Sequence, residues 1–455
     1  MYDIPSRTWN PARQWADPLI ATLALLIFML VGGQAKLRQQ RVARPDTQVS
    51  LQGRLQDLAL SAPRVLGPLL GKPAPHRPVP KALAAGLSNP WDKAILAIQA
   101  GEDGDRIQGA ELAKAPAGAL GPLFGRTWAY AYDGQGQPPA SSELSQLRRP
   151  LGDGYSARLL EMRVLARSGQ SIQALEKEAR QWFLPRLAAL AGAVCGGVLL
   201  GLAGLGFGLF LALAKAAPRT LPSYDMSGRA LLIVMLGWFL CLLAAGPVVG
   251  TVLVMAPFLR PIALPLVYGF HASLGLLFLT AAEGVPLRIL WQRLNPGRAG
   301  RALGMGLGFF ALAFAAVMAV AMALSPLLRN AEPPQKELLE LLSNLKGPLV
   351  LTLVFLTVAV VAPVFEEFLF RGFLLPWLGQ RLERRLGARW GWLLALTVTG
   401  ITFAAIHMQP LGLPTLSTLG IVLGLAFVRT GNLGTAILVH GLWNGSVFIL
   451  MRMIS

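Results

Sequence analysis

Long apolar blocks alternate with short polar segments over most of the chain. About 20 apolar residues cross the hydrocarbon core of a bilayer as a helix, and nine blocks approach or exceed that length. They lie at 18–35, 187–214, 230–257, 261–282, 303–325, 348–378, 390–408, 414–428 and 433–452. A long polar segment, residues 36–186, separates the first two blocks. The pattern predicts an all-α, multi-pass membrane protein with a polar domain inserted after its first span.

The polar segment has its own helical pattern. Residues 89–105 and 156–183 carry Ala and Leu at three- and four-residue spacing, and loops rich in Pro and Gly lie between them. A small, helical accessory domain is therefore expected. The predicted division of the chain is an N-terminal segment with the first span (1–35), the accessory domain (36–186), membrane helices two to five (187–325) and a membrane core (326–455).

Composition supports the membrane assignment. Hydrophobic residues make up 54% of the chain and charged residues 14%, whereas about 25% of residues are charged in a soluble domain. The net charge of +18 would suit nucleic acid, but Arg and Lys are concentrated in short loops between apolar blocks, as in the group Arg381, Arg384, Arg385 and Arg389. Such loops are typical of the cytoplasmic side of a membrane protein. The lipid bilayer is the expected partner, and nucleic acid is not.

The same rule gives an orientation. With a cytoplasmic N-terminus, most Arg and Lys of the short loops lie inside, and residues 36–186 lie outside the cytoplasm. Lys36 and Arg38 oppose this orientation, although long segments cross a membrane largely regardless of charge. A bias towards Ala, Gly, Leu and Arg favours a bacterial source, and hence the plasma (inner) membrane of a bacterium.

Small residues also recur at four-residue spacing, as in Gly204 with Gly208 and Gly304 with Gly308. This spacing lets two helix backbones approach closely. Packing within the molecule is the expected use, a dimer face is the alternative, and the oligomeric state stays open.

Three ionisable residues interrupt the block at 348–378. A charge at the bilayer centre costs at least about 2.5 kcal/mol, so such groups are usually functional or mutually paired. Glu367 and Arg371 are four residues apart and face each other on a helix, which predicts a structural ion pair. Glu366 is rotated by about 100° and lacks a local partner. Pro363 interrupts the helical hydrogen bonds just before it and could widen the space around Glu366.

Further polar residues lie in the later apolar blocks. His407 ends the span at 390–408, and His440 and Asn444 share one face of the last span. A carboxylate, two imidazoles and an amide suit water activation and oxyanion stabilisation. At 1.5 Å per residue, Glu366 lies about 18 Å, His407 about 25 Å and His440 about 12 Å from the inner end of its span. These heights do not match. Either the chain bends back at 408–410, or the predicted boundaries are off by a turn. His271, elsewhere in the membrane, is expected to bond a neighbour.

The motifs EEFLFR, FAAIH and HGLWN, in this order, resemble the EExxxR, FxxxH and HxxxN signature of the CPBP (CAAX protease and bacteriocin-processing) intramembrane endopeptidases. The resemblance covers residues 345–452. It implies hydrolysis of a peptide bond in a membrane-associated protein or peptide. It also implies that Glu366 and His407 activate water, and that His440 and Asn444 stabilise the oxyanion.

Two questions stay open at this level. Glu366, His407 and His440 could hold one zinc ion with an open fourth position, but the chain has no HExxH motif, and a mechanism without metal needs the same three groups. The expected cofactor is therefore none or one zinc ion. The alternative function is a non-catalytic membrane scaffold or immunity-type protein that keeps the protease fold.

Overall fold

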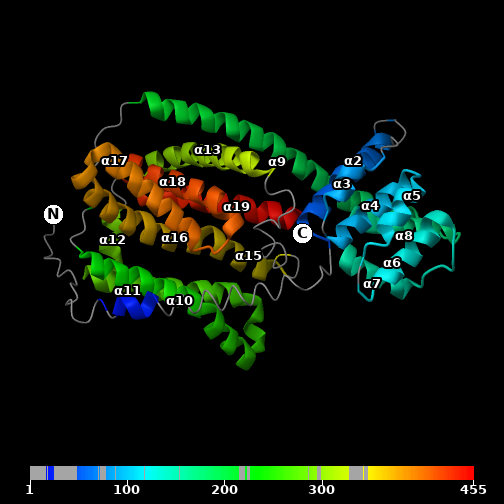
Figure 1. The fold of residues 1–455 in the computed structure, drawn as a ribbon, viewed down its shortest axis with the longest axis horizontal. Helices are drawn as coiled ribbons and strands as arrows, with labels where there is room; N and C mark the ends of the chain where they lie inside the picture. Colours follow the sequence, from blue (N-terminus) through cyan, green and yellow to red (C-terminus); the bar gives the residue numbers. More distant parts are fainter. Residues whose placement is uncertain are drawn as a thin grey trace. The chain divides into compact units, whose positions relative to one another are not determined.

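The computed structural model describes residues 17, 19–24, 49–69, 71, 78–87, 89–116, 118–152, 154–214, 221–222, 226–284, 286–294, 299–326, 342 and 347–454 (Figure 1). Regular structure in these ranges is helical throughout, which confirms the all-α prediction. Two compact units divide the chain: the described parts of Gln39–Cys195 form a polar unit, and those of Gly196–Leu327 and Leu341–Leu450 form a membrane unit. Most of the first predicted span lies outside the described residues.

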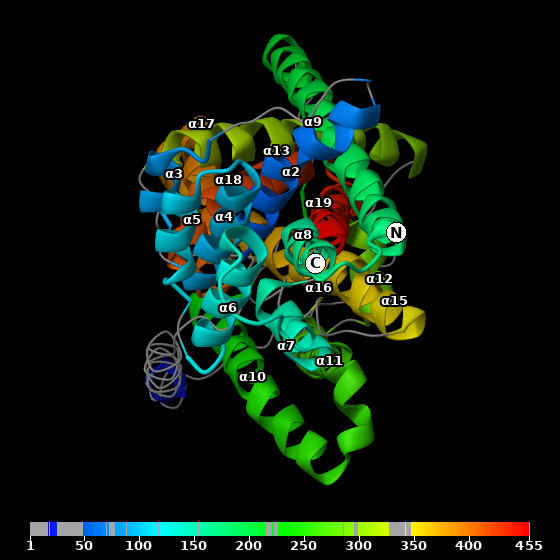
Figure 2. The same ribbon diagram turned by 90° about the vertical axis from the view of Figure 1, so that its right-hand side faces the viewer.

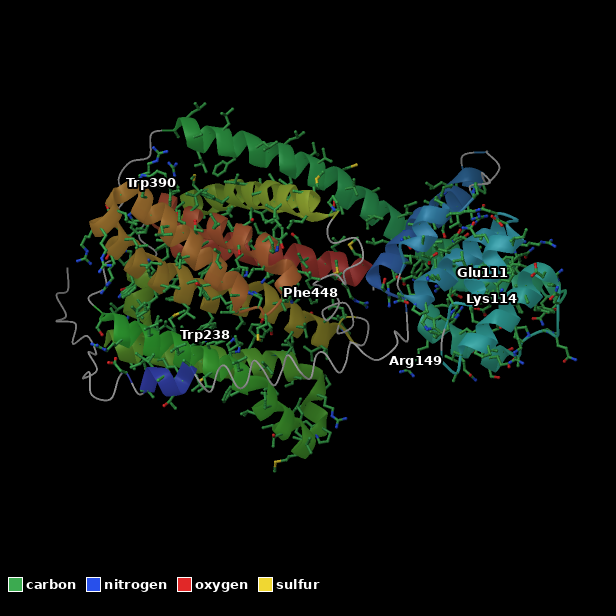
Figure 3. All side chains as sticks on the ribbon, viewed as in Figure 1. Glu111, Lys114, Arg149, Trp238, Trp390 and Phe448 are labelled. Carbon is green, nitrogen blue, oxygen red and sulfur yellow. The ribbon has the colours of Figure 1, made fainter. Side chains whose placement is uncertain are left out.

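The polar unit is a bundle of mostly short helices around an apolar core. Its helices are α2 (Leu51–Leu69), α3 (Lys81–Ala85), α4 (Pro90–Glu102), α5 (Arg106–Ala113), α6 (Gly121–Trp128) with the π turn η1 (Ala129–Asp133), α7 (Ser141–Leu151), α8 (Tyr155–Arg167) and the first part of α9 (Gln173–Leu213). Figure 3 labels three charged side chains at its surface, Glu111, Lys114 and Arg149; Lys114 pairs with Glu111 at 3.0 Å.

A buried polar network joins α2, α4 and α8 inside this unit. The Asp57 carboxylate accepts hydrogen bonds from the Ser156 amide at 3.0 Å and from the Ser61 hydroxyl at 3.2 Å. The Gln99 amide donates to both serine hydroxyls at 2.8 Å. Burial raises the pKa of Asp57 above its usual range, because desolvation disfavours the carboxylate.

The membrane unit contains long apolar helices. They are the rest of α9, α10 (Gly228–Met255), η2 (Pro257–Ile262), α11 (Ala263–Glu283), α12 (Leu287–Leu294), α13 (Ala299–Leu324), α15 (Pro348–Leu356), η3 (Thr357–Val361), α16 (Ala362–Glu367), η4 (Phe368–Leu374), α17 (Leu375–Ala405), η5 (Pro410–Gly412), α18 (Leu413–Thr430) and α19 (Leu433–Ile454). Figure 2 shows α10 and α11 side by side and joined at one end, with η2 as the connection.

Seven helices of the described chain are long and apolar enough to cross a membrane. One of them, Pro348–Ala405, contains two of the predicted spans. It turns back on itself at Gly387, whose φ of 76° falls in a region that favours glycine. The two halves of α17 then pack together, and the Trp392 indole donates to the Glu383 carboxylate at 2.9 Å. This hairpin returns the chain towards the level of Glu366.

Two π turns interrupt the helix that carries the charged residues. The first, η3, ends two residues before Pro363, and the second, η4, ends two residues before Pro376. A proline ring clashes with the carbonyl four residues earlier, and an extra residue in the turn moves that carbonyl away. The prolines thus explain where the helix departs from α geometry, on both sides of Glu366 and Glu367.

Glycines set the contact between α9 and α13. A Cβ atom at Gly204 would overlap the Ala311 carbonyl, and one at Gly308 would overlap the Phe207 ring. Close packing within the molecule therefore uses these two glycines, as expected from their spacing. A Cβ at Gly304 would meet no atom within 4 Å, so the spacing does not place every small residue in this contact.

Candidate active site

Glu367 and Arg371 form a buried ion pair at the start of η4. Arg371 Nη1 donates to Glu367 Oε1 at 2.8 Å, and Nη2 donates to the Gly420 carbonyl of α18 at 2.9 Å. The exposed fractions of the two side chains are 0% for Glu367 and 2% for Arg371. The guanidinium also lies over the Phe403 ring, 4.5 Å from its centroid. The pair thus ties the α16–η4 helix to α17 and α18.

The same carboxylate also orients His440. Glu367 Oε1 accepts from His440 Nδ1 at 2.9 Å, so it receives hydrogen bonds from Arg371 and His440 together. Because a carboxylate only accepts, Nδ1 carries a proton and the other ring nitrogen, Nε2, is free for chemistry. His440 Nε2 lies 3.9 Å from Glu366 Oε2, which is beyond hydrogen-bond length. Glu366 Oε2 itself is buried without a hydrogen-bond partner.

His407 lies in the turn that follows α17. Its Nδ1 bonds the Phe403 carbonyl at 2.8 Å, which again leaves Nε2 free. The backbone reverses immediately afterwards, at Met408, whose φ is 51°. The chain thus bends back after His407, which is one of the two solutions expected for its height. The Phe403 ring packs against the imidazoles of His407 and His440, with centroids 4.9 and 5.5 Å apart.

Asn444 contacts the first π turn. In η3 the Ala362 amide donates to the Thr357 carbonyl, and the next residue, Pro363, has no N–H for the Val358 carbonyl. Asn444 Nδ2 supplies the missing donor at 3.0 Å. One amide hydrogen of Asn444 is therefore used structurally, and the other remains for a ligand.

A glycine allows α19 to reach η3. A Cβ atom at Gly441 would lie 2.6 Å from the Ala359 carbonyl, so only glycine fits this approach. Gly441 directly follows His440 and precedes Asn444 by three residues. The close contact of α19 with η3 therefore fixes the height of both polar residues.

His271 of α11 completes the inventory of membrane histidines. Its Nδ1 bonds the Val267 carbonyl at 2.9 Å, which confirms the expected bond to a neighbour. Its ring packs on the ring of Phe365, the residue before Glu366, with centroids 5.7 Å apart. Trp238 of α10, labelled in Figure 3, packs on the same Phe365 ring at 5.7 Å.

These contacts bring some predicted site residues together more closely than others. Glu366, Glu367, Arg371 and His440 form one cluster. His407 adjoins it through Phe403, and Asn444 adjoins it through α19. Sequence reasoning missed the bond between Glu367 and His440, and no spacing signal could reveal it, because 73 residues separate them.

Glu366, His407 and His440 are the residues that the sequence offers as zinc ligands. In the part of the chain that the structure describes, no three His, Cys, Asp or Glu side chains are grouped to hold one ion. The arrangement gives no support to a metalloprotease.

Comparison with known proteins agrees with the motifs. Residues 348–446 match the family model of the type II CAAX prenyl endopeptidase Rce1-like domain. The chain carries an Rce1-like domain. The matched segment runs from α15 to α19 and so includes both carboxylates, Arg371, His407, His440 and Asn444. No curated protein and no solved structure matches the chain.

The Rce1-like domain is a membrane endopeptidase domain, and the apolar helices place this chain in a membrane. The match accounts for the segment that holds the cluster. It leaves out α9 to α13 and the polar unit, which the chain adds to the family domain.

Proposed function

We propose that the chain is an intramembrane endopeptidase that cleaves a membrane-associated protein or peptide, with Glu366 as the general base. The observation that carries this proposal is the unpartnered Glu366 Oε2, held 3.9 Å from an imidazole whose far side is anchored on a second carboxylate. A buried carboxylate without a hydrogen bond is costly in a membrane, so its retention needs a reason. A water molecule between Glu366 and the histidines supplies one.

The formal charges of the cluster can balance. Glu367 and Arg371 cancel each other, which leaves Glu366 and His440 as a second pair. With a carboxylate on Glu366 and an imidazolium on His440, the whole cluster is neutral. In that form Glu366 accepts a hydrogen bond, as a general base must. His440 Nε2 donates one, as an oxyanion donor must.

The reaction then follows from the side chains alone. Glu366 takes a proton from water, and the oxygen attacks the scissile carbonyl carbon. His407 Nε2 can accept the second hydrogen of that water, because its Nδ1 donates to Phe403. His440 and the free amide hydrogen of Asn444 donate to the oxyanion. Glu366 passes its proton to the leaving amine as the C–N bond breaks, which restores the carboxylate.

The family name gives a narrower substrate class than the one proposed for this chain. The family name describes prenyl endopeptidases acting at CAAX sequences. If the protein is bacterial, a peptide without a prenyl group is expected, and the plasma membrane is the expected location. The orientation proposed from the loop charges keeps the polar unit outside the cytoplasm. There it would capture or select substrates.

The proposal is tested by comparing membrane peptides from cells that express wild-type protein, Glu366→Gln or Glu383→Gln. Glu383 bonds Trp392 in the Gly387 hairpin, so its variant controls for removal of a carboxylate at another position. New peptide termini are expected with wild type and Glu383→Gln and not with Glu366→Gln. Termini that persist in Glu366→Gln would refute the assignment of the base. An unchanged cellular phenotype with Glu366→Gln would favour the scaffold instead.

A further inference from the structure

An imidazole outside the Rce1-like domain packs on Phe365, the residue that precedes the proposed base. His271 lies on α11, more than 75 residues before the matched segment, and is 1% exposed. Its ring packs between aromatic neighbours: Phe365 at 5.7 Å, Tyr268 at 5.0 Å and Trp238 at 6.5 Å between centroids. A fully buried imidazole in a membrane helix is costly unless its nitrogens are used.

One nitrogen of this ring is used in a familiar way. His271 Nδ1 bonds the carbonyl four residues earlier, as His407 Nδ1 does. A carbonyl only accepts, so Nδ1 carries the proton and the neutral Nε2 is an acceptor. The three histidines of the membrane unit, His271, His407 and His440, thus all anchor Nδ1 and keep Nε2 for another partner.

The residues around Phe365 include an unpartnered donor and an unpartnered acceptor. Trp238 Nε1 and Glu366 Oε2 are both buried without a hydrogen-bond partner. Trp238 and His271 pack on Phe365, and Glu366 follows Phe365 in the chain. Buried polar atoms are normally satisfied, so a water or a substrate amide is the expected occupant.

Close packing keeps α11 against this part of the site. A Cβ atom at Gly275, one turn after His271, would lie 2.6 Å from Trp238 and would overlap the Phe365 ring. Side chains larger than hydrogen at position 275 would push α11 away from Phe365. The sequence therefore keeps His271 at a fixed distance from the helix that carries Glu366.

From these contacts we infer that His271 is a positioning residue for Glu366, and that α10 and α11 form a wall of the active site that the family motifs do not include. A carboxylate and a neutral Nε2 are both acceptors, so their interaction requires a water or a proton between them. His271 thereby holds the water on Glu366 and keeps that carboxylate oriented. This inference rests on the proposed function for its catalytic consequence, but the contact itself can be measured without a substrate.

The first experiment uses the full-length protein with ¹⁵N-labelled histidine in detergent micelles. The chain has four histidines, so His271→Asn assigns the signals of His271 by difference. We expect the His271 ring signals to move in Glu366→Gln and to stay in place in Glu383→Gln. Identical His271 signals in wild type and Glu366→Gln would overturn the inference, whether or not the protein is a protease.

The second experiment separates positioning from packing. Asn mimics the Nδ1 side of histidine, Gln mimics the Nε2 side, and Phe keeps the ring alone. Cleavage of a peptide identified by the membrane comparison is measured for the three variants at position 271. We expect a fall in kcat on the order of 10- to 100-fold for His271→Phe and His271→Asn, with partial rescue in His271→Gln and little change in KM. Rescue by Asn and not Gln, or wild-type kcat in His271→Phe, would overturn the inference.

Two controls keep this result interpretable. Each variant must elute as a folded species in gel filtration, so that lost packing is not mistaken for lost chemistry. Glu366→Gln serves as the inactive reference. If it cleaves as well as wild type, the proposed function fails while the signals of His271 still decide whether the contact exists.

Discussion

The structure gives Glu367 a second role that its spacing in the sequence does not indicate. Its spacing from Arg371 indicates a structural pair, yet it also holds His440. Glu367→Gln keeps a similar shape and one acceptor oxygen but removes the negative charge. Arg371 would then retain its bond to the Gly420 carbonyl and lose the negative charge of Glu367, its ion-pair partner. The double variant Glu367→Gln with Arg371→Met removes both charges.

The expected magnitudes follow from burial. Removing one partner of a buried pair costs about 3–5 kcal/mol, because the remaining charge is left in a low dielectric. Replacing both partners by neutral groups is close to neutral, so the double variant should recover most of that loss. Its activity should not recover, since His440 still lacks the anion that fixes its ring. We expect a fall in kcat on the order of 100- to 1000-fold in both variants, as for loss of an oxyanion donor.

The assay has two parts on the same protein preparations. Unfolding is followed by titration with a denaturing detergent in mixed micelles, and kcat is measured on the peptide from the membrane comparison. Stability restored without activity would separate the two roles of Glu367. If the double variant regained wild-type kcat, Glu367 would serve Arg371 alone and the orientation of His440 would need another explanation.

Four further predictions concern other contacts. Asn444→Ala should lower kcat on the order of 100- to 1000-fold with KM nearly unchanged, and lose about 1–3 kcal/mol because the Val358 carbonyl is left unpaired; wild-type kcat would exclude an oxyanion role. Gly441→Ala should lose about 1–3 kcal/mol, since the added methyl meets the Ala359 carbonyl, and an unchanged detergent midpoint would contradict the close approach. Prolonged dialysis against a chelator should leave kcat unchanged, whereas a loss restored by zinc would show a metal requirement. Burial raises the pKa of Asp57, so the folded polar unit binds the proton more tightly than the unfolded chain; its stability should fall as pH rises from about 4 through the raised pKa, as seen by faster amide exchange in α8, and Asp57→Asn should flatten that dependence.

The sequence predicts most of the helical framework. Membrane helices leave a strong signal because every residue facing lipid must be apolar, and eight of the nine predicted blocks coincide with helices of the described chain. The pair of Glu367 and Arg371 is also predictable, since a four-residue spacing is a local property of a helix. The motifs locate His407 after α17, and His440 and Asn444 in α19, for a similar reason.

Contacts between distant residues were not predictable in the same way. The bond from Glu367 to His440 depends on how α19 packs on η3, and that packing depends on a missing side chain at Gly441. Pro363 indicates interrupted helical hydrogen bonds before Glu366, but the sequence pattern predicts neither π turn. The sequence predicts a bond from His271 to a neighbour, which is correct for Nδ1, but the position of His271 beside Phe365 comes from the packing of α11.

Burial is graded across the charged cluster. The residue exposures are 7% for Glu366, 2% for His440, 1% for Arg371 and 0% for Glu367. Glu366 is thus the most exposed of these four side chains, and Glu367 lies behind its neighbours. A bound peptide that covers Glu366 would therefore enclose all four side chains for as long as it stays bound.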